Sequence, residues 1–247
     1  MYLKRIHCIE HAPYESSGII QYWAEECNHP FSRTLLYKDE VLPSVKSFDW
    51  LIVMGGPMSV HDEGRFHWMT AEKKLIEKAI LEGKVVIGFC FGAQLLASVM
   101  GARVYKNKAK EIGWFPVTLN QSAKELSLFE GFPDEFMTLL WHAEMFDIPA
   151  LAVPVGSSAG CANQGFVLNE SVIGFQFHLE MTSQSIIDII DNCRMDLTGG
   201  KFIQSEMELL NNIKYTVDCN NLLEQLLVKL DERSSGTPIV SDREEEV

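Results

Sequence analysis

Residues 85–94 read Val-Val-Ile-Gly-Phe-Cys-Phe-Gly-Ala-Gln, a β-branched apolar run that breaks at small residues around Cys90. The apolar pattern resumes over residues 94–100 at helical spacing and ends at Gly101, a typical helix stop. A buried strand, a sharp turn and a helix would place Cys90 at the turn, as in a nucleophile elbow. The thiol would then project at the carboxyl end of the strand, where open α/β sheets bind ligands.

Two features favour a nucleophilic Cys90 over a cysteine that only packs in a core, although free cysteine usually packs. Gly88 and Gly92 lack the side chains that would crowd a sharp turn. The following helix N-terminus carries partial positive charge, which lowers a thiol pKa. The uncharged stretch 85–102 could also be interpreted as a membrane span, but it is short and interrupted by Gly, Ser, Gln and Cys. A buried strand followed by a helix explains it better.

The composition indicates one large α/β domain and argues against several classes of partner. The chain has 247 residues, 47% of them apolar, which is enough for a substantial core. A net charge of −13 argues against nucleic acid or an anionic membrane surface as the main partner. Residues 1–10 lack the long apolar core of a signal peptide, and the six cysteines form no Cys-x-x-Cys pair. We therefore expect a cytoplasmic protein with reduced thiols, no metal site and no cofactor.

Strand and helix patterns alternate through the first part of the chain. Strands are predicted over residues 2–9, 33–37, 50–54 and 85–89. Helices are predicted after a Ser16 or Ser17 cap through residue 23, over residues 70–81 and over residues 94–100. Because repeated alternation of this kind gives a parallel sheet, we predict a doubly wound α/β fold with a mostly parallel central sheet flanked by helices.

The second part of the chain changes character. Short strands are predicted within residues 104–105, 114–119, 138–141, 151–155, 165–168 and 172–177. They indicate an antiparallel excursion that returns to the main sheet. Further helices are predicted from a Thr182 or Ser183 cap to Cys193, near residues 202–213 and near residues 219–230. We expect residues 1–230 to form a single domain and the polar residues 231–247 to form a flexible acidic tail.

His178 is the strongest candidate for a base that activates Cys90. It ends the apolar run 172–177, so it too is expected at the carboxyl edge of a strand. Glu180 could accept a hydrogen bond from the imidazole and fix its tautomer, the orienting role in a catalytic triad. Taken alone, His178 could simply end a strand and pair with Glu180. Beside an elbow cysteine, the catalytic interpretation is the better one.

Backbone groups at two turns could stabilise an oxyanion. Gly55-Gly56-Pro57 follows the predicted strand 50–54, and the Phe91 N–H group opens the helix beside Cys90. A lone Gly-Gly-Pro would indicate only a turn. Here it closes the strand immediately before the nucleophile strand, so the Gly56 N–H group could point toward the same site as Phe91.

Three motifs together carry a resemblance to a known family. Residues 55–57, 88–94 (Gly-Phe-Cys-Phe-Gly-Ala-Gln) and 176–180 (Gln-Phe-His-Leu-Glu) resemble, in this order, the motifs of class I (triad-type) glutamine amidotransferases. The sequence looks close to the glutaminase domain of GMP synthases. The resemblance covers about residues 45–195 as read from the motifs. The family's common His-Pro-Glu is His178-Leu179-Glu180 here, and the intervening side chain takes no part in the chemistry.

The resemblance implies a mechanism and a set of site residues. Cys90 would attack the side-chain amide of glutamine, with the oxyanion held by the Gly56 and Phe91 N–H groups. His178 would protonate the departing ammonia and then activate water, oriented by Glu180. The residues that the resemblance implies for substrate binding are Gly55, Gln94, Trp141, His142, Ala143 and Glu144.

Several functions stay open at this point. No Gly-rich ATP pyrophosphatase loop follows the motifs, so we expect the domain to supply ammonia to a separate synthetase or to act alone. A γ-glutamyl hydrolase or peptidase could use the same Cys90, His178 and Glu180. A related group of cysteine peptidases fits less well, because that group usually carries His where Phe91 stands. A non-catalytic regulatory subunit is disfavoured because every triad position is filled.

Overall fold

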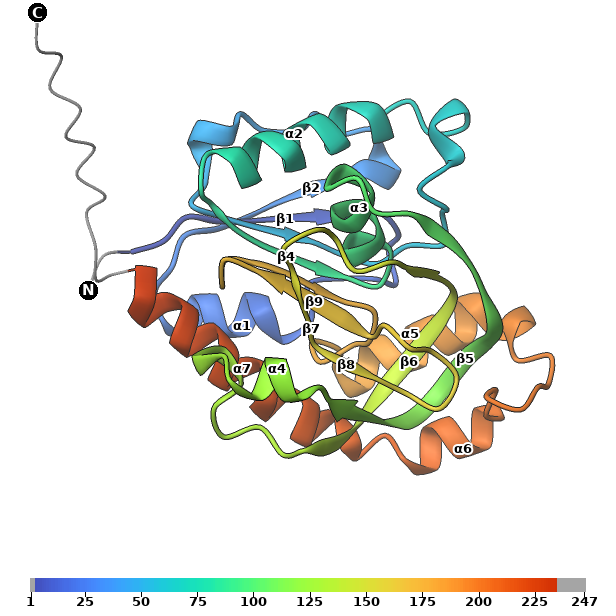
Figure 1. Cartoon of the computed structure of the whole chain (residues 1–247). Helices are drawn as coiled ribbons and strands as arrows, with labels where there is room; N and C mark the ends of the chain where they lie inside the picture. Colours follow the sequence, from blue (N-terminus) through green and yellow to red (C-terminus); the bar gives the residue numbers. More distant parts are fainter. Residues whose placement is uncertain (1–2, 235–247) are drawn as a thin grey trace, which may run out of the picture.

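The computed structural model describes residues 3–234, which form two sheets (Figure 1). The larger sheet has seven strands in the order β2-β1-β3-β4-β10-β9-β7. These strands are β1 (Ile6–Glu10), β2 (Phe31–Leu35), β3 (Trp50–Val53), β4 (Val85–Phe89), β7 (Val153–Pro154), β9 (Gly165–Leu168) and β10 (Val172–Phe175). The first five strands in the sheet order are parallel, and β9 and β7 pair antiparallel at one edge. The predicted α/β fold with a mostly parallel central sheet is confirmed.

Helices cover both faces of the larger sheet (Figure 1). One face carries α2 (Met69–Leu81) and α3 (Phe91–Val99), and the other carries α1 (Ile19–Glu26), α5 (Ser183–Cys193) and α7 (Tyr215–Ser234). Successive side chains of a strand point to opposite faces. Ile52 of β3 therefore packs in the core beneath α1, α5 and α7, whereas Leu51 and Val53 pack beneath α2 and α3. Strands buried on both faces are continuous apolar runs, which made them visible in the sequence.

The predicted antiparallel excursion is a second sheet of three strands, β6-β5-β8. Its strands are β5 (Val104–Leu119), β6 (Glu135–Phe146) and β8 (Gly156–Ser157). β5 and β6 are much longer than predicted because their polar residues interrupt the apolar pattern and the register shifts between Lys106 and Glu111. This long hairpin places residues 141–144 opposite the start of α3.

The predicted elbow at Cys90 is confirmed. Cys90 is the N-cap of α3 with φ 49° and ψ −108°, in the left-handed half of backbone space, which costs a non-glycine residue free energy. Its N–H group donates to the carbonyl of Phe175 in β10 at 2.7 Å. A Cβ atom on Gly88 would lie 2.6 Å from the Gly92 carbonyl carbon, and one on Gly92 would overlap the Val53 carbonyl oxygen. Glycine is therefore required at both positions.

The helix ends confirm some predictions and correct others. Of the two predicted caps, Thr182 and Ser183, Thr182 is the N-cap of α5, and it forms a capping box with Ser185. The predicted serine cap of α1 is wrong: Gly18 is the N-cap, and the Ile19 N–H group donates to the Glu180 carbonyl at 2.9 Å. The remaining helices are α4 (Gln121–Lys124), α6 (Glu206–Asn211) and 3₁₀ helices at Leu36–Lys38, Val45–Ser47, Asp62–Gly64, Ser127–Phe129 and Arg194–Asp196.

The C-terminal helix is longer than predicted. α7 continues to Ser234, so residues 231–234 of the expected tail are helical. The other residues of that tail lie outside the described part of the chain.

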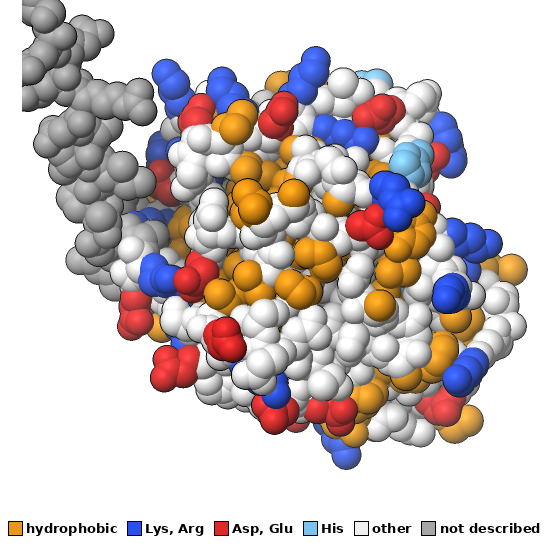
Figure 2. Space-filling view, in the orientation of Figure 1, with side chains coloured by type: hydrophobic (Ala, Val, Ile, Leu, Met, Phe, Trp, Pro, Cys, Tyr) orange, Lys and Arg blue, Asp and Glu red, His pale blue; other side chains and the backbone are white. Residues whose placement is uncertain are grey.

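Among the helices of residues 3–234, none combines the length and the apolar character needed to cross a membrane. On the face drawn in Figure 2, acidic and basic side chains are interspersed around the edge, and apolar side chains gather toward the middle.

Gly92→Ala is expected to lower the free energy of unfolding by about 3 kcal/mol or more, because the added methyl group meets backbone that cannot move aside. Urea unfolding of the whole chain measures this change. Gly64→Ala is the matched control: no atom lies within 4 Å of the added carbon, and its effect should stay within about 0.5 kcal/mol. Equal stability of the two variants would contradict the tight approach of α3 to β3.

Candidate active site

A pocket of about 300 Å³ opens beside Cys90, between the carboxyl ends of β3 and β4 and residues 141–144 of β6. It lies at the edge where parallel α/β sheets bind ligands. The predicted site residues in its wall are Gly56, Cys90, Gln94, Trp141, His142, Ala143 and Glu144. Other parts of the wall come from Glu15, Pro57, Met58, Ser59, Asp62, Lys110, Ile112, Cys193 and Asp196.

The Cys90 thiol lies in the pocket wall and is only 7% exposed. It donates a long hydrogen bond to the Trp141 carbonyl at 3.4 Å. Burial raises the pKa of Cys90, and interactions with His178 and with the Phe91 N–H group offset the rise only in part. We expected the helix N-terminus to lower this pKa. The Phe91 N–H group at the helix N-terminus lowers it as expected, but the loss of water around the thiol outweighs this effect and the pKa of Cys90 stays raised.

His178 and Glu180 form a buried pair beside Cys90. His178 Nδ1 lies 2.7 Å from Glu180 Oε1, and both side chains are almost fully buried. Because a carboxylate accepts, Nδ1 carries the proton and donates it, as in a triad. Burial lowers the pKa of His178, but the Glu180 charge and contact with Cys90 raise it more, so the pKa stands well above its ordinary value.

The second ring nitrogen of His178 is directed to the thiol. Within residues 3–234, Nε2 makes no hydrogen bond. His178 is nevertheless close enough to Cys90 for each residue to shift the pKa of the other. The backbone around the ring is fixed, because the His178 N–H group donates to the Leu139 carbonyl at 3.0 Å and Thr138 Oγ1 donates to the His178 carbonyl at 2.8 Å. The imidazole can therefore receive a proton from Cys90 with little reorganisation.

The two predicted oxyanion donors lie on the two elements that meet at the elbow. Phe91 is the first residue of α3, and its N–H group interacts with the Cys90 sulfur. Gly56 follows β3 and lines the pocket. Gly55 is not part of the pocket wall; its carbonyl oxygen lies 3.0 Å from His11 Nδ1. The structure therefore brings Gly56 to the pocket but not Gly55.

Gln94 connects the nucleophile helix to the β6 wall. Its side-chain amide donates to Gln176 Oε1 at 3.1 Å and, more weakly, to the Glu144 carbonyl at 3.4 Å. Glu144 Oε1 in turn accepts a hydrogen bond from Ser59 Oγ at 3.1 Å. These contacts join α3, β6 and the segment after β3 around one pocket.

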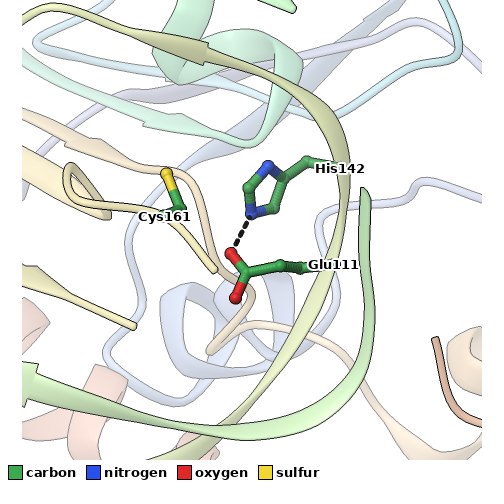
Figure 3. Close-up of side chains that lie close together, drawn as sticks. All are labelled: Glu111, His142 and Cys161. Atoms are coloured by element: carbon green, nitrogen blue, oxygen red, sulfur yellow. Dashed lines mark ion pairs between the residues drawn. The ribbon is translucent and has the colours of Figure 1, made fainter. Parts of the chain in front are cut away.

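The His142 side chain lies in a buried polar cluster with Glu111 and Cys161 (Figure 3). His142 Nε2 lies 3.1 Å from Glu111 Oε2, and Nδ1 lies 3.0 Å from the Glu144 carbonyl. The ligand atoms of the three residues lie within 4.8 Å of one another, so they could hold a metal ion. Hydrogen bonds from Ser158, Gly160 and Gln164 already satisfy the Glu111 carboxylate, and the cluster holds β6 in place.

The family model described as "Glutamine amidotransferase class-I" matches residues 25–196. The chain belongs to the class I glutamine amidotransferase family.

Individual relatives agree with this assignment to the glutamine amidotransferases. YfeJ of Salmonella typhimurium, named as glutamine amidotransferase-like, is 32% identical over 83% of this chain and 89% of its own. A GMP synthase of Bacillus pumilus is 28% identical over 73% of this chain but only 34% of its own length. The chain therefore spans about a third of that relative. The resemblance to the glutaminase domain of GMP synthases is confirmed.

Solved structures share the fold of this class I amidotransferase. A glutamine amidotransferase from Methylobacillus flagellatus superposes with a TM-score of 0.87 at 29% identity and covers 100% of both chains. One from Thermotoga maritima gives a TM-score of 0.85 at 29% identity, over 94% of this chain and 100% of that chain.

Sequence reasoning missed Glu15, Lys110, Cys193 and Asp196 in the pocket wall. A signal was present for Glu15, because it follows the carboxyl end of β1, the same edge of the sheet that carries Cys90 and His178. Lys110 and Asp196 carry no local signal, since they meet only through the irregular part of β5 between Lys106 and Glu111 and the segment after α5.

His178→Ala is expected to raise the pKa of the Cys90 thiol further, because the imidazole is the strongest group that now opposes the effect of burial. The rate of Cys90 alkylation by iodoacetamide, followed by mass spectrometry against pH, should shift to higher pH. Alkylation of half-buried Cys27 in the same samples is the control and should not change. An unchanged profile for Cys90 would contradict the pairing of His178 with the thiol.

Proposed function

We propose that this chain hydrolyses the side-chain amide of glutamine, or of a related γ-glutamyl compound, with Cys90 as the nucleophile. One observation carries the proposal: a thiol at a strained strand–helix turn lies in a pocket beside a His178–Glu180 pair joined at 2.7 Å. A thiol, a base and an orienting carboxylate are the groups that nucleophilic amide hydrolysis requires.

In the first step, the Cys90 proton passes to His178 Nε2 and the sulfur attacks the γ-carbonyl carbon. The Gly56 and Phe91 N–H groups stabilise the oxyanion that forms. The C–N bond then breaks, and the proton on Nε2 moves to the departing nitrogen, which leaves as ammonia or an amine. A γ-glutamyl thioester on Cys90 remains, and His178 is neutral again.

In the second step, water enters the space that the amine has left. His178 Nε2 takes a proton from the water while the water oxygen bonds to the thioester carbon. The C–S bond breaks, Cys90 leaves as the thiolate and recovers the proton from His178, and glutamate is released. Glu180 stabilises the imidazolium in both steps because it accepts from Nδ1 throughout.

The substrate's α-amino and α-carboxylate groups would bind at the Gln94 and β6 wall. Gln94 and Glu144 supply side-chain groups there, and residues 141–144 supply backbone groups. This chain resembles the glutaminase part of GMP synthases, so the ammonia could pass to a separate synthetase subunit as well as to solvent. Either fate leaves the chemistry at Cys90 unchanged.

Cys90→Ala is expected to reduce glutamate release from glutamine by about 10⁴-fold or more, as loss of a nucleophile does elsewhere. Purified full-length protein is assayed for glutamate by a coupled dehydrogenase reaction. Cys27→Ala, which removes a thiol far from the pocket, is the control and should keep the wild-type rate. Turnover by the Cys90→Ala variant at the wild-type rate would overturn the mechanism.

A further inference from the structure

Glu15 is a buried acid in the pocket wall that the proposed chemistry does not use. Its side chain lies beside Cys90 in the lining, and the residue is only 8% exposed. Among residues 3–234, no hydrogen bond and no ion pair reaches its carboxylate. Buried carboxylates are normally paired or hydrogen-bonded, since burying a charge without a partner is costly. An unpartnered carboxylate that faces a pocket therefore points to a ligand with a positive charge or N–H donors.

The position of Glu15 assigns it to the side of the pocket where the leaving group departs. Its carboxylate packs directly on Gly55, where any side chain would overlap it. The loop that follows it ends at Ile19, whose N–H group donates to the Glu180 carbonyl at 2.9 Å. Glu15 is thus held between the end of β3 and the His178–Glu180 pair. The nitrogen that departs must lie near His178 Nε2 to take its proton, and Glu15 lies close enough to His178 for their charges to interact.

We propose that Glu15 forms a leaving-group subsite that selects γ-glutamyl amides of ammonia or of cationic amines and rejects γ-glutamyl amino acids. The selection rests on the hydrolysis proposed above. A leaving amino acid carries a carboxylate next to the scissile nitrogen and would bring it toward the Glu15 carboxylate. A leaving diamine would instead bring an ammonium group there, which can pair with Glu15.

Other charges in the pocket wall do not reverse this preference. Among the described residues of the wall, Lys110 is the one lysine or arginine. Its Nζ lies 2.9 Å from Asp196 Oδ1. Asp62 accepts from the Ser59 N–H group at 3.0 Å and lies 3.6 Å from Arg65. Burial raises the pKa of Glu15, and the nearby Glu180 raises it further while His178 opposes the rise. A cationic leaving group would oppose that rise in the same way as His178.

The test compares γ-glutamyl amides that differ in the charge of the leaving amine. Full-length protein is given the monoamide of ethylenediamine, the ethylamide and γ-glutamylglycine, with glutamine as reference, and glutamate release gives kcat/KM for each. We expect the cationic amide to exceed γ-glutamylglycine by about 100-fold, since like charges brought together in a binding site are strongly disfavoured. Glu15→Gln should reduce that ratio to about tenfold or less, and Glu15→Asp, which keeps the charge, should retain the preference.

Asp62→Asn is the matched control, because it removes one charge from the same pocket wall at a carboxylate that already has partners. It should keep the wild-type ratio. Equal or faster turnover of γ-glutamylglycine by the wild type would overturn the selection, whether or not the variants fold. An unchanged ratio in Glu15→Gln would overturn the role of Glu15. Turnover of none of the four compounds would instead overturn the proposed hydrolysis, and the selection with it.

Discussion

The close approach of α3 to the ends of β3 and β4 is the constraint on which the rest of the site depends. Gly92 lies against the Val53 carbonyl, and Cys90 is held at φ 49° by the bond from its N–H group to Phe175. The strain of this backbone is of order 1–3 kcal/mol, which a bond between neighbouring strands and a fully buried helix face can offset. The same geometry directs the thiol away from the sheet and places the Phe91 N–H group beside it. A looser junction would lose the thiol position and the oxyanion donor together.

Burial acts on the catalytic groups in opposing directions, and the arrangement of charges decides the balance. Loss of water raises the pKa of Cys90 and by itself lowers that of His178, so both groups would be neutral. Glu180 changes this, because its carboxylate lies 2.7 Å from His178 Nδ1 and favours the imidazolium. Both pKa values are therefore raised, which makes the thiol a weak acid and the neutral imidazole a strong proton acceptor. Proton transfer and attack can then occur when the substrate binds. Between turnovers, the neutral thiol is protected from reaction.

The fold class and the positions of Cys90 and His178 could be predicted from the sequence because each depends on local pattern or on strand ends. Residues 85–94 carry their strand, turn and helix in contiguous residues, and His178 ends an apolar run. The long β5–β6 hairpin could not be predicted, because a bulge between Lys106 and Glu111 and exposed polar residues break the period of two. The cap of α1 at Gly18 was missed because it is set by the distant Glu180 carbonyl and not by a neighbouring side chain. Glu15 was missed for a related reason, since its environment comes from β3 and β10 and their following loops.

The wall opposite Cys90 depends on a polar cluster that no short motif reveals. Glu111 in β5 accepts from Ser158 Oγ at 2.6 Å, from Gln164 Nε2 at 2.9 Å and from the Gly160 N–H group at 3.1 Å, and it also contacts His142 in β6. A buried carboxylate of this kind stabilises a structure only while all its partners are present; removing one partner of a buried pair costs about 3–5 kcal/mol. Glu111 therefore holds residues 141–144 through its contact with His142, and Gln94 holds them through its hydrogen bond to the Glu144 carbonyl. The Trp141 carbonyl, which accepts from the Cys90 thiol, belongs to this fixed segment. The pocket wall that would bind the γ-glutamyl group is thus held by its contacts with both β5 and α3. Selection among substrates is left to the side where Glu15 lies.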